Sequence, residues 1–482
     1  MVLWIGVDDT DSLSGMCTTF LATEIVRALT EDFDLIGYPR LVRLNPNIPW
    51  KTRGNGAICV AIGVGRGPSR IVGSFDGEPV LSFLRGVTPK HLETVCDRVQ
   101  KLVERWAHFE DPDTNPAFAI LRRKPEPGLY WKAVRRIVLL AEARAAVHAS
   151  GPIRSYKNGR GTIGALSAVS WKPRDRTYEI LTYRAPALWG TRRSIEADSV
   201  IEMDRAFPST FNNYDYDNSR VVIAPRTPCP ILFGIRGDHP NDLRPAMEMV
   251  RGERPARWLI FETNQGTDDH VVRSRGSEPC RTVRFEGTVT DSPRTLPGGH
   301  EVFAVDGRSV TAYEPSKQFR LIVRRLLPGD RVEVIGAVRE SPSTVNLEKI
   351  RVLALVPEVR KVANPTCHVC FKRAKSLGRG RGFRCARCRI RFPESAAVTV
   401  RIRRALELGW YEPPVGSRRH LSMPIKRMRP AVRTARRARL EVDSEPTEWG
   451  LPVGAGDGLG AAPLGSAEFQ GPGFGSGTRE LE

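Results

Sequence analysis

Residues 2–29 read VLWIGVDDTDSLSGMCTTFLATEIVRAL, and this stretch decides how the fold begins. Val2 to Val7 is a short apolar run of β-prone residues, which predicts a buried strand. A polar loop follows, and from Phe20 to Leu29 apolar residues recur at the spacing of one helix face. Thr18 falls near the first turn of that helix. The chain is therefore expected to open with a strand, a polar loop and a helix.

The loop Asp8-Asp9-Thr10-Asp11 places three carboxylates at the end of the buried strand. Carboxylates this close repel one another unless a cation lies among them. Protein-bound Mg²⁺ usually takes one or two acidic side chains together with phosphate oxygens, and a helix N-terminus near Thr18 attracts phosphate. The pattern favours a nucleotide and magnesium site. The alternative interpretation is an Asp-rich turn that caps the helix.

A second string rich in hydrogen-bond donors, RLNPNIPWKTRGNGA, covers residues 43–57. Lys51 and Arg53 suit a triphosphate, and Gly54 and Gly56 allow backbone amides to approach it. The string is not a Walker motif, and by itself it is equally typical of a basic hairpin connection. The acidic loop nearby in the sequence favours the nucleotide site.

Strand and helix patterns are mixed through the first 275 residues, which indicates α/β or α+β architecture. Up to about residue 155, strand-like runs are expected at 35–44 and 57–64, and helices at 91–106 and about 130–147. The next part has strand patterns at 180–183, 221–224 and 258–261 and a helix pattern at 241–251. This second part is compatible with a small ferredoxin-like fold.

From about residue 281 to residue 356 the sequence changes to short β runs separated by turn residues. Strands are expected at 283–289, 301–305, 309–313, 331–338 and 345–352, with one helix at about 315–327. Five strands with a helix after the third is the order of an OB-fold, a common single-stranded nucleic-acid module. Another small β-barrel is the alternative. Phe285, Phe303 and Phe319 would either stack on bases or be buried.

Four cysteines form two close pairs, Cys367-x-x-Cys370 and Cys385-x-x-Cys388. Two CxxC turns supply the four thiolates of a tetrahedral zinc site, and such a closed site leaves no position for catalysis. The pattern therefore predicts structural zinc, with His368 outside the ligand set. The other five cysteines lack a partner pattern and are expected to be packing residues.

The 482 residues carry 74 Lys and Arg against 54 Asp and Glu, a net charge of +20. This excess favours a polyanionic partner such as nucleic acid over a merely solvated basic surface. No apolar run approaches the roughly 20 residues that span a bilayer, and the start of the chain does not resemble a signal peptide. A cytoplasmic protein is expected. The Gly-, Pro- and Ala-rich end, residues 431–482, is expected to be disordered.

Two further strings have unusual compositions, one typical of a rigid turn and the other of a site for a guanidinium group. Thr227 to Gly237, TPCPILFGIRG, indicates a rigid turn around Cys229 that leads into a strand. Just before it, FNNYDYD places Asp215 among aromatic residues, which together can hold a guanidinium. A surface turn with a solvated Asp is an equal alternative.

Many irregular strings together resemble the TiaS family, the archaeal tRNA-isoleucine 2-agmatinylcytidine synthetases. The matching stretches cover almost everything from residue 1 to about 428; they include GVDDTDSLSGMCTTF, PRLVRLNPNIPWKTRGNGA, DTNPA, KNGRGTIGALSAV, TPCPILFGIRG, TNQGTDDH, YEPSKQFR, VNLEKI, the four paired cysteines and RRHLSMPIKRM. The first knuckle, CHVCF, departs from common zinc knuckles because it lacks their Pro and Gly.

The resemblance implies a multidomain α+β protein. The expected domains are a kinase-like ATP and magnesium domain (1–155), a ferredoxin-like domain (156–275), an OB-fold (280–357), a zinc ribbon with a basic segment (360–430) and the tail (431–482). The implied activity is ATP-dependent ligation of agmatine to carbon two of the wobble cytidine in isoleucine tRNA with a CAU anticodon. A phosphorylated cytidine would be the intermediate, with ATP converted to AMP and phosphate. The resemblance implies no obligate protein partner and no membrane.

Residue by residue, the resemblance assigns Asp8, Asp9 and Asp11 to metal binding and catalysis, and Thr18 to autophosphorylation. The adjacent Thr19 is not distinguished from Thr18 by the sequence alone. The resemblance also assigns a cofactor-binding group (Lys51, Arg53, Gly54 and Asn55), and agmatine is expected at Asp215, Cys229 and Gly234. The expected cofactors are ATP, Mg²⁺ and Zn²⁺.

Two other functions compete with this interpretation. A noncatalytic nucleic-acid-binding protein would explain the barrel and the ribbon, but it has no use for an acidic loop that faces RNA. A related kinase acting on another RNA or on a small molecule would keep the loop and change the substrate.

Overall fold

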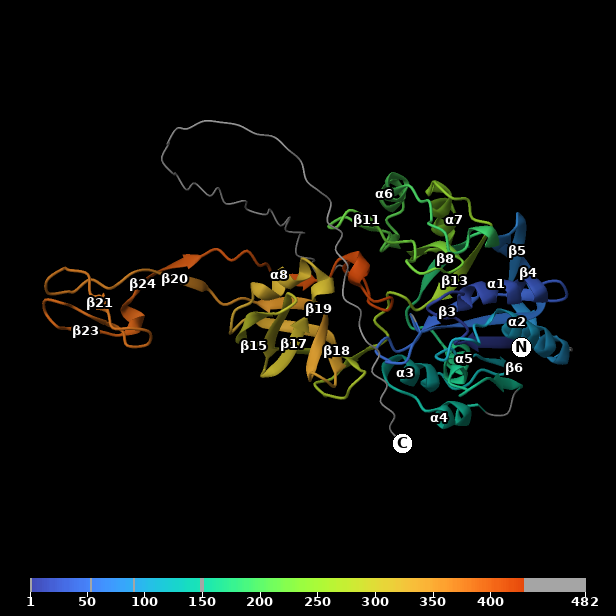
Figure 1. Ribbon diagram of the computed structural model, residues 1–482, viewed down its shortest axis with the longest axis horizontal. Helices are drawn as coiled ribbons and strands as arrows, with labels where there is room; N and C mark the ends of the chain where they lie inside the picture. The colour runs from blue at the N-terminus through green and yellow to red at the C-terminus, as the bar shows by residue number, and fades with distance from the viewer. Residues whose placement is uncertain (1, 53, 90–91, 148–150, 429–482) are drawn as a thin grey trace, which may run out of the picture. The chain divides into compact units, whose positions relative to one another are not determined.

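The computed structural model describes residues 2–52, 54–89, 92–147 and 151–428 (Figure 1). The predicted tail 431–482 and the predicted nucleotide ligand Arg53 lie outside the described residues. Within the described ranges, every helix is too short or too polar to cross a bilayer.

A large mixed sheet organises the first 270 residues. Its main path runs in the order β7-β6-β1-β4-β3-β13-β8-β12-β9, and β2 and β5 attach to it through β4. The strands are β1 (Leu3–Asp8), β2 (Asp34–Ile36), β3 (Arg40–Arg43), β4 (Gly56–Phe75), β5 (Glu78–Val87), β6 (Ala117–Leu121), β7 (Ile153–Ser155), β8 (Thr177–Tyr183), β9 (Thr210–Phe211), β12 (Ile231–Gly237) and β13 (Arg257–Thr263). Because β13 pairs with β3, β4 and β8, the two predicted α/β regions share one sheet.

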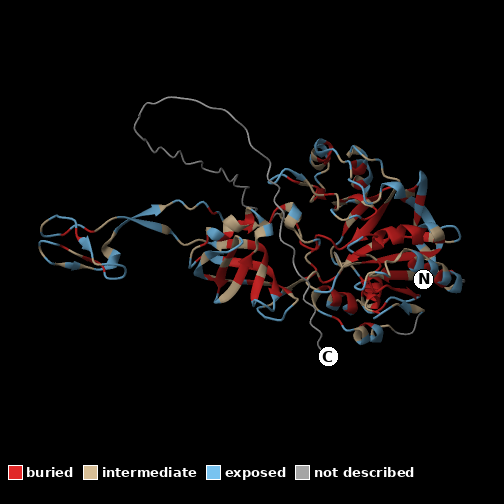
Figure 2. Cartoon of the chain, viewed as in Figure 1, coloured by how far each residue is buried: buried red, intermediate tan, exposed pale blue. Residues whose placement is uncertain are grey.

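Helices cover both faces of this sheet (Figure 2). They are α1 (Thr18–Leu29), α2 (Leu92–Trp106), α3 (Gly128–Arg135), α4 (Leu140–Ala145), α5 (Gly161–Ser170), α6 (Ala197–Ala206) and α7 (Pro240–Met249). Large apolar residues of β1 pack with α1 and α2, whereas small residues of β4 and β6 pack with α3 and α5. Gly6 is required for this close approach, because a Cβ there would lie 2.2 Å from the carbonyl oxygen of Ala165 in α5.

The structure confirms the opening strand and helix and the helix at 91–106, and it corrects three other expectations. The helix expected at 130–147 is two helices, α3 and α4, because Arg136 is extended and takes the chain out of the helix. The strand expected at 57–64 continues to Phe75 and pairs with β5 in a long hairpin. The run at 221–224 contributes only the two-residue strand β11 (Arg220–Val221), paired with β10 (Tyr214–Asp215).

A closed five-stranded barrel follows, as the strand spacing predicted. It contains β15 (Thr282–Leu296), β16 (His300–Val305), β17 (Arg308–Ala312), β18 (Arg331–Arg339) and β19 (Thr344–Ala354), with α8 (Phe319–Arg324) after the third strand. The barrel closes because β15 pairs with both β16 and β18. Two short strands, β14 (Val271–Arg273) and β25 (Gly409–Tyr411), extend the sheet. Phe285, Phe303 and Phe319 are buried in the barrel core, so their rings are not a base-stacking surface.

The cysteine-rich part contains five short strands. β20 (Glu358–Ala363) pairs with β24 (Val398–Ile402), and β21 (Lys375–Ser376), β22 (Phe383–Arg384) and β23 (Arg391–Phe392) form a small sheet. This part has few buried residues, so it depends on something other than an apolar core (Figure 2).

Candidate active site

A cavity of about 400 Å³ lies at the C-terminal end of β1, where the acidic loop begins. Three of the predicted strings contribute to its wall: the acidic loop, the basic string and the TPCPILFGIRG segment. The lining residues that the sequence singled out are Asp8, Asp9, Asp11, Thr18, Thr19, Lys51, Gly54, Asn55, Cys229 and Gly234. Strings separated by more than 200 residues therefore meet around one space.

The acidic loop is held against α5 and the segment DTNPA. Asp8 is the last residue of β1, and a Cβ on Gly164 of α5 would lie 1.7 Å from its carboxylate oxygen. Thr114 Oγ1 donates to the carbonyl oxygen of Asp11 at 2.7 Å. The Asp11 carboxylate accepts a hydrogen bond from Thr52 Oγ1 at 3.1 Å, so the acidic loop and the basic string are in direct contact.

The electrostatics of this loop call for a cation. Burial and the charge of Asp9 raise the pKa of Asp8 well above its usual value. Burial raises the pKa of Asp9 to about 6, although Arg160 and hydrogen bonds from Asn115 oppose the shift. Both carboxyl groups are thus held where ionisation is costly, and a bound cation would relieve that cost.

Thr18 and Thr19 both begin α1 and are buried at the cavity wall. Thr10 Oγ1 donates to Thr18 Oγ1 at 3.2 Å, and Thr19 Oγ1 lies 2.9 Å from the sulfur of Cys17. The Thr18 hydroxyl therefore contacts the acidic loop through Thr10, whereas the Thr19 hydroxyl contacts Cys17.

The basic string forms another part of the cavity wall. Asn55 adopts a left-handed conformation (φ 46°), and its Nδ2 donates to the carbonyl oxygen of Asn45. A Cβ on Gly54 would lie 2.6 Å from a guanidinium nitrogen of Arg43, so any other residue there would displace the end of that side chain. Lys51 is exposed at the rim, where Nζ donates to the carbonyl oxygen of Ile48 at 3.2 Å.

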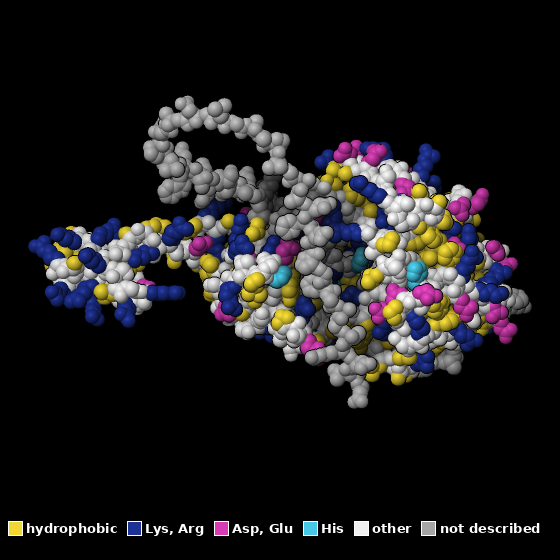
Figure 3. Space-filling model, in the orientation of Figure 1, with side chains coloured by type: hydrophobic (Ala, Val, Ile, Leu, Met, Phe, Trp, Pro, Cys, Tyr) yellow, Lys and Arg dark blue, Asp and Glu magenta, His cyan; other side chains and the backbone are white. Residues whose placement is uncertain are grey.

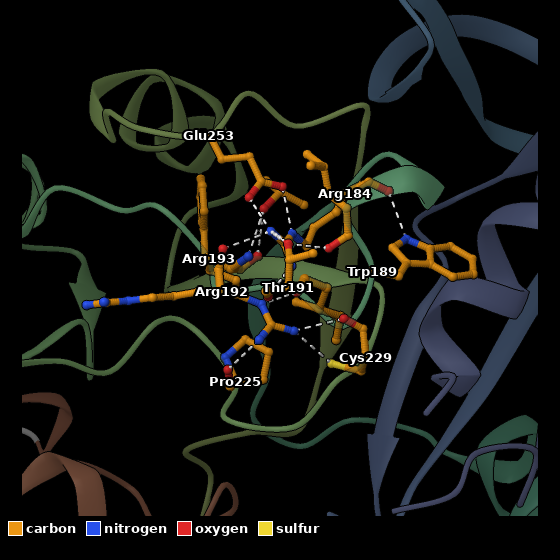
Figure 4. Close-up of polar contacts among 12 residues, drawn as sticks. Arg184, Trp189, Thr191, Arg192, Arg193, Pro225, Cys229 and Glu253 are labelled. Atoms are coloured by element: carbon orange, nitrogen blue, oxygen red, sulfur yellow. Dashed lines mark hydrogen bonds and ion pairs between the residues drawn. The ribbon is translucent and has the colours of Figure 1, made fainter. Parts of the chain in front are cut away.

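Arg193 holds the turn around Cys229 in place through hydrogen bonds to its backbone (Figure 4). Its guanidinium donates to the carbonyl oxygens of Pro225, Thr227, Cys229 and Ile231 at 2.8–3.0 Å. One fork-shaped cation thus orders four carbonyl groups of a segment, residues 225–231, that contains three prolines.

Asp215 lies apart from these residues. It is buried in β10, where its carboxylate accepts hydrogen bonds from Asn218 Nδ2 at 3.0 Å and from the backbone N–H of Gly416 at 3.4 Å. It is not among the residues that line the cavity, unlike Cys229 and Gly234.

The sequence analysis missed several charged lining residues, among them Arg43, Arg160, Glu179, Arg236 and His420. Glu179 of β8 accepts hydrogen bonds from Arg236 Nε and from Gln265, which belongs to the buried string TNQGTDDH. Arg43 and Arg236 belong to strings that the sequence marked as possible binding sites, whereas no local pattern marked Arg160, Glu179 or His420 as part of a site.

The four paired cysteines come together as predicted. Their sulfurs all lie within 4.8 Å of one another, and among the described residues no other set of three or more potential ligands converges in this way. Zn–S bonds of about 2.3 Å place the sulfurs of a tetrahedron about 3.8 Å apart, so the donor set fits zinc. His368 packs edge-on against Phe392 and is not part of the set.

The two knuckles share one backbone geometry although neither has the usual glycine. Phe371 and Arg389, each directly after the second cysteine of its pair, have φ of 55° and 59°. The backbone N–H groups of Cys367 and Cys385 each donate across the turn, to Lys372 and Ile390 at 2.9 Å. The departure of CHVCF from common knuckles is therefore accommodated as backbone strain.

Family comparisons identify three parts of the chain. A TiaS TCKD domain model matches residues 4–158, a TiaS FLD domain model matches 159–270, and a TiaS C-terminal zinc ribbon domain model matches 364–406.

Relatives match almost end to end. TiaS of Methanocaldococcus jannaschii, the 2-agmatinylcytidine synthetase of the second isoleucine tRNA, is 38% identical over 441 residues, covering 88% of this chain and 99% of the relative. The protein of the same name from Archaeoglobus fulgidus is 39% identical over 442 residues, covering 89% and 98%.

Solved structures agree with these matches. A complex of TiaS with the second isoleucine tRNA and ATP superposes with a TM-score of 0.76 at 37% identity, covering 90% of this chain and 99% of that one. A complex of TiaS with the same tRNA, AMPCPP and agmatine gives 0.74 at 35% identity, covering 90% and 99%.

Proposed function

The chain belongs to the TiaS family, and on that premise we propose that it ligates agmatine to the wobble cytidine of CAU-anticodon isoleucine tRNA, with ATP as the activating substrate. The observation that supports this most directly is the cavity that joins the acidic loop, the basic string and the TPCPILFGIRG segment. A reaction between three substrates needs such a meeting point.

Carbon two of cytosine carries a carbonyl oxygen, which is a poor leaving group, and phosphorylation converts it into a good one. In the proposed reaction, the exposed Lys51 and the backbone at Gly54 and Asn55 receive the ATP phosphates at the rim of the cavity. Arg53 belongs to the same string but lies outside the described residues. Thr18 would be autophosphorylated, since its hydroxyl borders the acidic loop.

Asp8 and Asp9, with Asp11, would hold Mg²⁺ together with the nucleotide phosphates, and the ion would neutralise charge during phosphoryl transfer. The raised pKa of both Asp8 and Asp9 supports this assignment, because it reports carboxylates short of positive charge. The ligand atoms of the three acids do not converge as the cysteine sulfurs do. That spacing suits Mg²⁺, which keeps several water and phosphate ligands.

Agmatine would lie along the wall that contains Cys229 and Gly234. Its amine must attack unprotonated, while its guanidinium needs carboxylate or carbonyl acceptors. Glu179 provides a carboxylate beside Gly234, and a Cβ on that glycine would lie 3.1 Å from the Glu179 oxygen. Asp215, outside the cavity lining, would act only indirectly through the segment around Gly416.

The proposal includes a role for each part of the chain. Residues 1–155 would act as the kinase-like domain, 156–275 as the ferredoxin-like domain, 280–357 as an OB-fold and 360–430 as the zinc ribbon. Lys and Arg gather on the ribbon (Figure 3), where the matched segment 364–406 has twelve of them and one acid, Glu394. Such a surface suits contact with the RNA backbone.

The test is mass spectrometry of transcribed isoleucine tRNA after incubation with ATP, Mg²⁺ and agmatine. Wild type should add the mass of agmatine less one water to the wobble cytidine, because the amine replaces the carbon-two oxygen, and Asp8→Ala should abolish the addition without loss of tRNA binding. Reactions without agmatine, or with uridine at the wobble position, are the matched controls. Binding of the tRNA with no mass gain by wild type would favour the nucleic-acid-binding alternative or a different amine.

A further inference from the structure

The segment after the zinc ribbon, residues 413–428, returns to the large sheet. The backbone N–H groups of Gly266 and Asp268 donate to the carbonyl oxygens of His420 and Leu421 at 2.8 and 2.9 Å. The backbone N–H of Met423 donates to the Asp268 carboxylate at 2.7 Å. This segment, here called the return segment, is therefore fixed against the string TNQGTDDH by main-chain hydrogen bonds.

Ion pairs anchor the return segment on both sides of His420. Arg427 pairs with Asp238 at 2.7 Å and with Asp175 at 3.2 Å. Arg419 pairs with Glu348 of the barrel at 3.0 Å and donates to Asn47 of the basic string at 2.7 Å. The position of His420 is thus set by the sheet, the barrel and the basic string together.

His420 lines the cavity, and the part of the residue that is exposed faces this space. Its Nδ1 lies 3.0 Å from Nη2 of Arg236. A guanidinium only donates hydrogen bonds, so Nδ1 must be the acceptor. In the neutral ring the proton is consequently on Nε2, which makes that atom a hydrogen-bond donor.

The ring is also held in its neutral form. Desolvation and the charges of Arg43 and Arg236 lower the pKa of His420 well below its usual value. Besides these two cations, Glu179 lies in the same part of the cavity and pairs with Arg236 at 2.9 Å. A neutral imidazole with Nδ1 occupied can donate from Nε2, but it has no free nitrogen with which to accept a proton.

The Nε2 donor faces Gly54 of the basic string. The position of a Cβ on Gly54 is 3.3 Å from Nε2 of His420 and 2.6 Å from a guanidinium nitrogen of Arg43. Nε of Arg43 is buried and has no hydrogen-bond partner among the described residues. Two guanidinium groups and an imidazole N–H therefore gather beside a glycine-rich loop, and within the described ranges only Arg236 of this group has a carboxylate partner.

We propose that His420, with Arg43 and Arg236, forms a subsite for a phosphoryl oxygen, to which His420 donates through Nε2–H. The subsite rests on the proposed function and deepens it, since both ATP and the tRNA backbone supply such oxygens. Unlike the acidic loop, where a phosphate could not be held without a cation, this subsite presents hydrogen-bond donors and positive charge.

The experiment compares His420→Leu, which removes the donor, with His420→Gln, which keeps an N–H group at similar reach. His239→Leu, at an exposed histidine before α7, is the matched control. Binding of AMPCPP with Mg²⁺ and of transcribed isoleucine tRNA is measured separately, alongside kcat and KM for each substrate. Circular dichroism and thermal melting establish that each variant is folded.

His420→Leu should weaken one of the two ligands by about 10- to 100-fold, as expected for a lost hydrogen bond to a charged group. His420→Gln should recover most of that affinity, and His239→Leu should match wild type. Loss confined to AMPCPP assigns the oxygen to the nucleotide, and loss confined to tRNA assigns it to the RNA backbone. Unchanged affinity for both ligands in His420→Leu overturns the proposal. The proposal is also overturned if His420→Leu and His420→Gln both bind the ligands normally but lose turnover to the same extent. That result would indicate a role of His420 in proton transfer.

Nitrogen NMR of wild-type protein labelled at histidine keeps the proposal testable if His420→Leu does not fold. His420 should show a protonated Nε2 and an unprotonated Nδ1, and the Nε2 signal should move on addition of AMPCPP or tRNA. The opposite tautomer, or no movement with either ligand, overturns the proposal. A wild-type protein that binds these ligands but does not modify tRNA would refute the proposed function and leave the subsite standing.

Discussion

The cavity and the zinc ribbon both concentrate charge, but they hold it by different means. The cavity contains partly buried charges of both signs, and distant segments of the chain fix them, as Thr52 and Thr114 fix Asp11. The charged side chains of the ribbon, a segment of about 40 residues, are mostly cations. Its only converging set of potential metal ligands among the described residues is the four cysteine sulfurs. Distant contacts stabilise the first region, and a local metal site stabilises the second.

Zinc removal should give the largest effect and should be confined to the ribbon. A structural zinc contributes about 10–16 kcal/mol of apparent binding free energy, and few residues of the ribbon are buried. Cys370→Ser or a strong chelator should therefore unfold the ribbon while the cavity stays formed. Limited proteolysis with mass spectrometry should show new cleavage within 364–406.

Nucleotide affinity is the internal control for that experiment. It should stay within about twofold of wild type, while tRNA affinity falls and loses part of its salt dependence. If chelation weakened AMPCPP binding as much as tRNA binding, the two regions would not be independent and the comparison would fail.

Arg193 tests whether the cavity depends on distant contacts. Arg193→Lys keeps the charge but loses the fork that orders four carbonyl groups, each hydrogen bond to a charged group contributing about 1.5–3 kcal/mol. The KM for agmatine should rise about tenfold or more, and the KM for ATP should change little. Arg192→Lys, at an exposed neighbour, is the control. Equal KM values for agmatine in the two variants would show that the turn holds its own shape.

The same difference explains what the sequence could predict. The opening strand and helix, the barrel strands and the cysteine site follow from spacing over a few residues, so pattern alone located them. Glu179 and His420 meet Arg236 only because β8, β12 and the return segment converge, and neither Glu179 nor His420 has a local signature. Asp215 stays a prediction: its aromatic neighbours suggested a binding site, and its side chain contacts Asn218 and Gly416 outside the cavity lining.

A substitution at Asp9 tests how much its buried negative charge destabilises the folded protein. Its folded-state pKa of about 6 exceeds the unfolded value of 3.8, so its ionisation opposes folding. That cost is complete above about pH 6 and vanishes as the pH falls below 3.8. At pH 7.5 Asp9→Asn should raise the free energy of unfolding by roughly 1–3 kcal/mol, while ligase activity falls.

Asparagine suits this substitution because it tolerates the left-handed backbone that Asp9 adopts (φ 58°). Urea unfolding of both proteins at pH 7.5 and pH 4 measures the effect, and the gain should shrink at the lower pH. A loss of stability at pH 7.5 would mean that Arg160 and Asn115 more than offset the burial of the carboxylate.

Phe371 offers the smallest and most local test. Its side chain is 79% exposed, yet its φ of 55° lies in the left-handed region, which costs a residue with a Cβ about 1–2 kcal/mol. Phe371→Gly should remove that strain, partly offset by the greater freedom of glycine in the unfolded ribbon. The net gain of about 1 kcal/mol or less should appear as slower proteolysis of the ribbon at limiting zinc.

Because Arg389 has the same conformation in the second knuckle, Arg389→Gly should give a similar gain but also lower tRNA affinity by removing a cation. Faster proteolysis of both variants would show that these side chains support the knuckles, and that the ribbon relies on more than its four sulfurs.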